Sequence, residues 1–194
     1  MSLQELVRDG QWTTEPVRAE WNAGGELLVE AREESDAWRE TSYGFVHDNA
    51  HALLAPLGAR EAVEVTFVLD YDQQFDQAGV MIRVDESTWI KAGVEVSDGV
   101  AQVGAVVTHR VSDWSVAPVP EWVGREVTVR ASRDGDAVTI RARVEDEPWH
   151  LVRVAPLSPA ADAQAGLFCC APTRPGLVVR FVAHRRSEPD GSLH

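Results

Sequence analysis

The sequence lacks the segments that would place a protein in a membrane or outside the cell. It contains no run of about 18 or more apolar residues, which excludes a transmembrane helix. Residues 1–10 include Glu5, Arg8 and Asp9 and have no apolar segment typical of a secretory signal. We therefore expect a protein that is located in the cytoplasm and does not bind a membrane.

Cysteine is nearly absent. The two thiols, Cys169 and Cys170, are adjacent, so in a strand they would point to opposite faces and are poorly placed to bond with each other. Buried, reduced thiols fit this arrangement best. Two cysteines at this spacing would make an odd metal site, and we expect neither a metal nor another cofactor.

Positive charge is scarce. The chain has 31 acidic and 18 basic residues, which gives a formal net charge of −13. This excess repels phosphate backbones and argues against nucleic-acid binding. Lys91 is the only lysine. Its compact ammonium group either serves a purpose in its strand or has survived by chance.

Helical patterns are almost missing. No segment of ten or more residues has the apolar period of a helix, although residues 2–7 and 50–57 could hold a turn or two. Short alternating runs bounded by Gly and Pro are common instead, as in residues 62–69. Comparable runs lie at 17–21, 27–31, 80–84, 90–96, 126–132, 136–144, 165–171 and 177–184. These runs predict an all-β antiparallel sandwich, with one domain over residues 1–185 and a flexible polar tail over 186–194.

Three consecutive runs between Asp76 and Ser115 have an unusual outer face. Strand periodicity directs Ile82, Val94 and similar residues to the core, and it leaves polar, aromatic and glycine residues on the other side. Gly79 and Gly93 on this face would allow another group to approach the sheet closely.

We consider two interpretations of this face. It is either a solvated surface with weak cross-strand ion pairs, or the concave binding face of a curved sandwich. The second is favoured because tryptophan on an exposed sheet face is otherwise a liability. Indole rings would stack on a carbohydrate or small polar metabolite, while polar side chains bind its hydroxyl groups. The candidate ligand-binding residues are Gln77, Arg83, Trp89, Lys91, Glu95 and Trp114, with Trp38 and Tyr43 at one rim.

Common catalytic motifs are absent. The chain has no Gly-x-Ser-x-Gly elbow, no phosphate-binding glycine loop and no His-Glu-x-x-His. Glu95 is a candidate for one of the two carboxylates of a glycosidase, whereas Asp76 and Asp85 lie at strand ends without the right spacing. A glycoside-active enzyme predicts a second carboxylate near Glu95 and a raised Glu95 pKa. The sequence favours a binding protein over an enzyme.

Six segments together resemble the DUF1349 family. They are residues 38–45 (WRETSYGF), 76–85 (DQAGVMIRVD), 89–95 (WIKAGVE), 106–108 (VVT), 112–115 (SDWS) and 166–172 (GLFCCAP). The resemblance extends from about Trp12 to Phe181 and implies a concanavalin A-like lectin/glucanase jelly roll of two curved antiparallel sheets.

The resemblance implies less about function, because the family carries no settled activity. The sequence lacks both the Glu-x-Asp-x-x-Glu strand of glucanases with this fold and the calcium-site spacing of legume lectins. The family includes a yeast protein described as a regulator of enolase. This implies another alternative, a protein-interaction module that regulates a metabolic enzyme, with a flat apolar patch or a homodimer interface.

Overall fold

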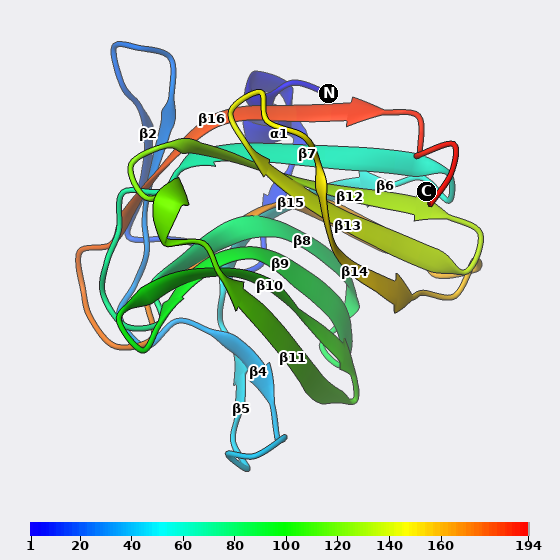
Figure 1. Cartoon of the computed structure of the whole chain (residues 1–194), viewed down its shortest axis with the longest axis horizontal. Coiled ribbons are helices and arrows are strands. Elements are labelled where there is room, and N and C mark those ends of the chain that lie inside the picture. Colours follow the sequence, from blue (N-terminus) through cyan, green and yellow to red (C-terminus); the bar gives the residue numbers. More distant parts are fainter. Residues whose placement is uncertain (194) are drawn as a thin grey trace.

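The computed structural model of the chain describes residues 1–193 and consists mainly of antiparallel β-strands (Figure 1). One short helix, α1 (Leu3–Asp9), precedes the strands. It begins at a capping box, in which the Ser2 hydroxyl accepts a hydrogen bond from the Glu5 N–H and the Glu5 carboxylate accepts one from the Ser2 N–H. Within the described residues, no helix has the length and apolar character needed to cross a membrane.

Two seven-stranded sheets form the sandwich. The first has the spatial order β1, β6, β15, β8, β9, β10, β11, and the second has the order β14, β13, β12, β7, β16, β3, β2. The strands of the first are β1 (Gln11–Trp12), β6 (His51–Leu57), β8 (Gln77–Asp85), β9 (Thr88–Ser97), β10 (Val100–His109), β11 (Val111–Pro118) and β15 (Ala163–Cys170). Those of the second are β2 (Arg18–Trp21), β3 (Leu27–Glu30), β7 (Glu61–Val68), β12 (Glu126–Asp134), β13 (Ala137–Val144), β14 (His150–Pro156) and β16 (Val178–Ser187). The predicted antiparallel β-sandwich is confirmed.

A small third sheet pairs β4 (Ala37–Arg39) with β5 (Val46–Asp48). Figure 1 shows this hairpin on the side of the first sheet that faces away from the second sheet, below the arched strands β8, β9 and β10. A 3-10 turn, η1 (Pro120–Trp122), joins β11 to β12 and so connects the two sheets.

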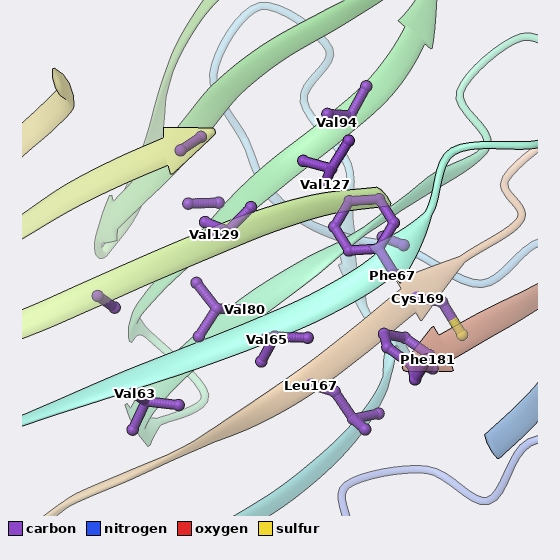
Figure 2. Close-up of a cluster of buried hydrophobic side chains, with 14 of the residues drawn as sticks. Val63, Val65, Phe67, Val80, Val94, Val127, Val129, Leu167, Cys169 and Phe181 are labelled. Carbon is purple, nitrogen blue, oxygen red and sulfur yellow. The ribbon is translucent and has the colours of Figure 1, made fainter. Parts of the chain in front are cut away.

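The main core lies between the two seven-stranded sheets (Figure 2). The inward positions predicted for residues 62–69 are confirmed, since Val63, Val65 and Phe67 are completely buried. Cys169 belongs to this core, whereas Cys170 belongs to a separate cluster on the outer face of the first sheet. The two free thiols therefore point to opposite faces, as the sequence predicted.

The prediction of a helical turn at residues 50–57 is wrong. Residues 51–57 form strand β6, which pairs with both β1 and β15. Leu53 packs in the main core and Leu54 in the cluster on the outer face. A strand buried on both faces has a continuous apolar run without alternation, and such a run resembles a short buried helix.

The C-terminal segment contacts the second sheet. Strand β16 continues to Ser187, beyond the predicted end of the domain at residue 185. Asp190 then forms ion pairs with Arg130 of β12 and Arg141 of β13. The single domain and the flexible tail stay predictions, and His194 of that tail lies outside the described residues.

Candidate functional site

The outer face of the first sheet is organised in rows that cross its strands. One row contains Gln77 and Glu95, which lie opposite each other on β8 and β9. The next row contains three glycines, Gly79, Gly93 and Gly104. The row after that joins Met81, Lys91, Val106 and Trp114. A strip without side chains therefore separates Glu95 from Lys91.

The backbone of the neighbouring strands leaves room only for glycine in this row. A Cβ atom on Gly93 would lie 1.9 Å from the Ala78 carbonyl oxygen, and one on Gly79 would lie 2.0 Å from the Ala92 carbonyl oxygen. The close approach predicted at these glycines is thus made by the backbone of the neighbouring strand rather than by an outside group. The strip without side chains leaves a trough in the face.

The β4–β5 hairpin covers one part of this face and carries a chain of aromatic rings. Trp38 meets Tyr43 edge to face at 5.6 Å between ring centroids. Tyr43 stacks on Phe45 at 5.3 Å, and Phe45 meets His47 edge to face at 4.7 Å. The turn between the strands contains Glu40, Ser42 and Gly44 with positive φ, which folds it back tightly.

Beneath the hairpin lies a second, smaller apolar cluster. It contains Ala37, Trp38, Ala50, Ala52, Leu54, Met81, Trp89, Val106, Phe168 and Cys170. Trp89 is only 1% exposed within it, so the predicted exposure of this indole is wrong. The segment around the hairpin buries the part of the sheet face that strand alternation alone would leave open.

Two ion pairs join this covering segment to the sheet. Lys91 Nζ lies 2.8 Å from Asp36 Oδ1, and the ammonium group is almost completely buried. Arg83 binds Asp48 through both terminal nitrogens, at 2.5 and 2.8 Å. Burial has the largest single effect and lowers the pKa of Lys91. The charges around it, that of Asp36 first, together with the hydrogen bond to Asp36 outweigh burial, so the pKa is raised.

A pocket of about 670 Å³ opens between the hairpin and the uncovered end of the sheet. Its floor and one side come from Gln77, Glu95, Val106 and Trp114, and the remaining lining is Glu33, Glu34, Asp36, Trp38, Tyr43, Phe45, His47, Asn49, Phe75, Pro172 and Thr173. A smaller recess of about 20 Å³ lies at the floor, over Gly93 and Gly104 and between Lys91 and Glu95. The recess is about the size of one water molecule or one hydroxyl group.

The wall opposite the hairpin is held by an ion pair. Arg174 donates to both carboxylate oxygens of Asp76, which is fully buried immediately before β8. Thr173 donates its hydroxyl hydrogen bond to the Gln74 carbonyl oxygen at 2.6 Å. These contacts fix the loop over residues 172–176 beside Phe75.

Among the acidic residues of the pocket, Glu95 has the most strongly shifted pKa. Burial raises its pKa to about 7, the charge of Lys91 opposes this shift, and the charge of Asp36 adds to it. Within the part of the chain that the structure describes, no group donates a hydrogen bond to the Glu95 carboxylate.

The structure brings together most of the predicted site residues but not all of them. Gln77, Glu95, Trp114, Trp38 and Tyr43 line the pocket, and Lys91 lines the recess. Arg83 and Trp89 line neither space and instead hold the hairpin against the sheet.

Sequence reasoning missed several pocket residues. Phe45 was not among the predicted site residues, yet it is 42% exposed on the pocket wall. The aromatic density of residues 38–45 was the available signal. The acidic segment at residues 33–36 carried no comparable signal, since its place beside Glu95 depends on the path of the chain. Among residues 1–193, no group of three or more His, Cys, Asp or Glu side chains is arranged to hold a metal ion.

Comparisons with known proteins identify relatives of this chain. Residues 12–189 match a family described as "Protein of unknown function (DUF1349)". "Regulation of enolase protein 1" of Saccharomyces cerevisiae is 35% identical over 189 residues, which is 97% of this chain and 94% of that protein. "Uncharacterized protein AN7484" of Emericella nidulans is 28% identical over 170 residues, covering 81% and 84% of the two chains.

Solved structures agree with the fold. The crystal structure of a functionally unknown protein from Saccharomyces cerevisiae superposes with a TM-score of 0.88 at 34% identity, over 95% of this chain and 99% of that chain. Lectin I-B4 of Griffonia simplicifolia has a TM-score of 0.61 at 12% identity, over 96% and 98% of the two chains. A xylan β-1,4-xylosidase of Bacillus halodurans has a TM-score of 0.66 at 15% identity, over 84% of this chain and 33% of that chain. The last two similarities concern the fold alone.

Proposed function

The chain belongs to the DUF1349 family, and we propose that it binds a carbohydrate or a small polar metabolite in the pocket between its curved sheet and the β4–β5 hairpin. The observation that carries this proposal is the pocket of about 670 Å³, whose size is typical of ligand sites. Aromatic side chains form its walls, and Gln77 and Glu95 converge at its floor.

The side chains of the pocket suit a ligand with both apolar and polar faces. Tyr43 and Trp114 are 56% and 37% exposed, so a ring could stack on either of them. The recess beneath offers Lys91 on one side and Glu95 on the other to a single hydroxyl group. The xylosidase that shares this fold is named for a carbohydrate, xylan, although a shared fold does not by itself transfer function.

A thermal-shift screen of monosaccharides, short oligosaccharides and polar metabolites tests the proposal. A ligand should raise the melting temperature of the wild type and have a much smaller effect on Tyr43→Ala and Glu95→Gln. Trp21→Ala is a matched control, because Trp21 is an exposed aromatic residue of β2 outside the pocket lining. Equal shifts in all four proteins would place binding elsewhere and contradict the proposal.

A glycoside-cleaving role for Glu95 is a second candidate, which its pKa of about 7 supports. Asp36 lies in the same pocket, but it is already paired with Lys91. Turnover of chromogenic glycosides that is lost in Glu95→Gln would support this role. Turnover that persists in Glu95→Gln would rule it out.

A third candidate is regulation of a metabolic enzyme through a protein contact. The name of the 35% identical yeast relative supports it, and so do the exposed side chains of Tyr43, Phe45 and Val46 at the hairpin. A binding titration with the enolase of the same organism tests it, and loss of binding in a Tyr43→Ser variant is the expected result. We also propose a cytoplasmic location, which the two free thiols support.

A further inference from the structure

The pocket lining is acidic. Glu33, Glu34, Asp36 and Glu95 contribute four carboxylates, and the described lining contains no lysine or arginine. Lys91 lies beneath the floor, is 4% exposed and is paired with Asp36 at 2.8 Å. One ammonium group therefore offsets one of four carboxylates, and the pocket repels anions such as phosphorylated or carboxylated metabolites.

The acidic segment is fixed rather than free. Ser35 is completely buried, where it donates to the Arg32 carbonyl oxygen at 2.6 Å and accepts from the Ala171 N–H at 2.9 Å. Asn49 accepts from the Asp36 N–H at 2.9 Å. The backbone that carries these carboxylates is therefore tied to β15 and to the hairpin, so their charges stay at the pocket.

Four side-chain donors of the pocket are already engaged by backbone carbonyl oxygens. Trp38 Nε1 donates to the Thr41 carbonyl oxygen at 3.0 Å, and Asn49 Nδ2 donates to that of Glu34 at 3.0 Å. Gln77 Nε2 and the Thr173 hydroxyl likewise donate to backbone carbonyl oxygens, at 3.1 and 2.6 Å. What the pocket offers in surplus is acceptors, which suits a ligand that mainly donates hydrogen bonds.

Aromatic faces complete the arrangement. Tyr43 and Phe45 stack with an interplanar angle of 13° and are both exposed on one wall, and Trp114 is exposed on β11 at the floor. Aromatic faces attract cations through their quadrupole. Carboxylates together with these faces favour an ammonium group over a neutral hydroxyl group.

We infer that the ligand of this pocket is an organic cation, such as an ammonium-bearing metabolite or an amino sugar. This inference rests on the proposed binding function and specifies its ligand class. The ammonium group lies between the aromatic wall and the carboxylates, and the rest of the ligand extends along the floor.

Choline and its neutral isostere 3,3-dimethylbutan-1-ol test the charge alone, because the two molecules have nearly the same shape. Isothermal titration at pH 8, where Glu95 is ionised, should give about tenfold tighter binding of choline to the wild type. The preference should fall severalfold in Glu95→Gln and in Glu34→Gln. Asp146→Asn, in an exposed turn outside the pocket lining, should retain it.

A second matched set, glucosamine, glucose and glucose 6-phosphate, is titrated at pH 7, where most of the glucosamine amine is protonated, and separates the two proposals. If glucose binds as tightly as glucosamine and Tyr43→Ala abolishes both, the charge inference is overturned and the pocket remains a binding site. If none of the five probes binds, or if neither Tyr43→Ala nor Glu95→Gln changes their affinity, both proposals are overturned.

Discussion

At the scale of single residues, Glu95 is the acid whose protonation the fold shifts into the neutral range. Burial raises its pKa from 4.5 to about 7. Between these values the native state holds more protons than the unfolded chain, so the contribution of Glu95 to stability decreases as the pH rises. Above pH 7 the fold bears the full cost of an ionised, half-buried carboxylate.

We therefore expect Glu95→Gln to raise the free energy of unfolding by about 1–3 kcal/mol at pH 8 and to change it little at pH 4. Urea unfolding at the two pH values measures this difference. Asp146→Asn, which is exposed, should show no such pH dependence. An equal effect of Glu95→Gln at both pH values would contradict the raised pKa.

Gly93 must lack a side chain because the neighbouring strand leaves no room for one. Gly93→Ala would place a methyl group 1.9 Å from the Ala78 carbonyl oxygen, and backbone must move to accept it. We expect a loss of about 2–4 kcal/mol in the free energy of unfolding, measured in urea. Gly191→Ala meets no atom within 4 Å and should be nearly neutral; a similar loss there would count against this explanation.

At the scale of elements, the β4–β5 hairpin is the part that turns a sheet face into a pocket. Its strands have three residues each, so most of its attachment comes from side chains. Arg39 donates to the Arg110 carbonyl oxygen at 3.0 Å, and Ser112 accepts from the Arg39 N–H at 2.9 Å. The buried Lys91–Asp36 ion pair to β9 and the more exposed Arg83–Asp48 pair to β8 complete the attachment.

Removing one member of the buried ion pair should loosen this element. We expect Asp36→Asn to cost about 3 kcal/mol, because the Lys91 ammonium loses its counter-ion in a buried position. The double variant Lys91→Met/Asp36→Asn should recover most of that loss. Urea unfolding of the wild type, Asp36→Asn, Lys91→Met and the double variant measures the coupling, and a double variant no more stable than Asp36→Asn would refute this account.

An exposed ion pair provides the control for that cycle. Arg18 and Glu20 are separated by 3.1 Å with both side chains about half exposed, so Glu20→Gln should change stability little.

Most strands of the two large sheets were predictable from the sequence, whereas β6 and the hairpin were not. Alternation over eight residues assigned both faces of β7 correctly, because one face is buried against the other sheet and the opposite face is more open. The same rule failed for Trp89, since burial of its face depends on residues about fifty positions earlier in the chain. Glu95 and Gln77 could be assigned to one face, but their acidic neighbours at residues 33–36 depend on the path of the covering segment.

At the scale of the whole molecule, the N-terminus is tied to the last strand. His184 of β16 is buried, and its Nδ1 lies 3.1 Å from the Met1 carbonyl oxygen. Burial lowers the pKa of His184 to about 4, below its ordinary value of 6.5. Between pH 6.5 and 4 the unfolded chain therefore binds more protons at this residue, and stability falls as the solution becomes more acidic.

We expect His184→Asn to retain the bond to Met1, because its amide nitrogen can replace Nδ1 as the donor. Between pH 6.5 and 4, the free energy of unfolding should fall by about 2–3 kcal/mol less in this variant than in the wild type. Urea unfolding at several pH values measures the two slopes. The matched control is His150→Asn, at an exposed histidine, and parallel slopes for all three proteins would contradict this role of His184.

The glycine row has a consequence for how relatives of this protein can diverge. Because the neighbouring backbone leaves no room for a Cβ atom at Gly79, Gly93 or Gly104, this part of the floor cannot be reshaped by point substitution. Changes of ligand preference must then arise in the floor side chains that flank the glycines, such as Gln77 and Glu95, or in the rim at residues 33–49 and 172–173, which lies outside the main core. A library restricted to these rim positions should therefore yield new specificities on an unchanged sandwich.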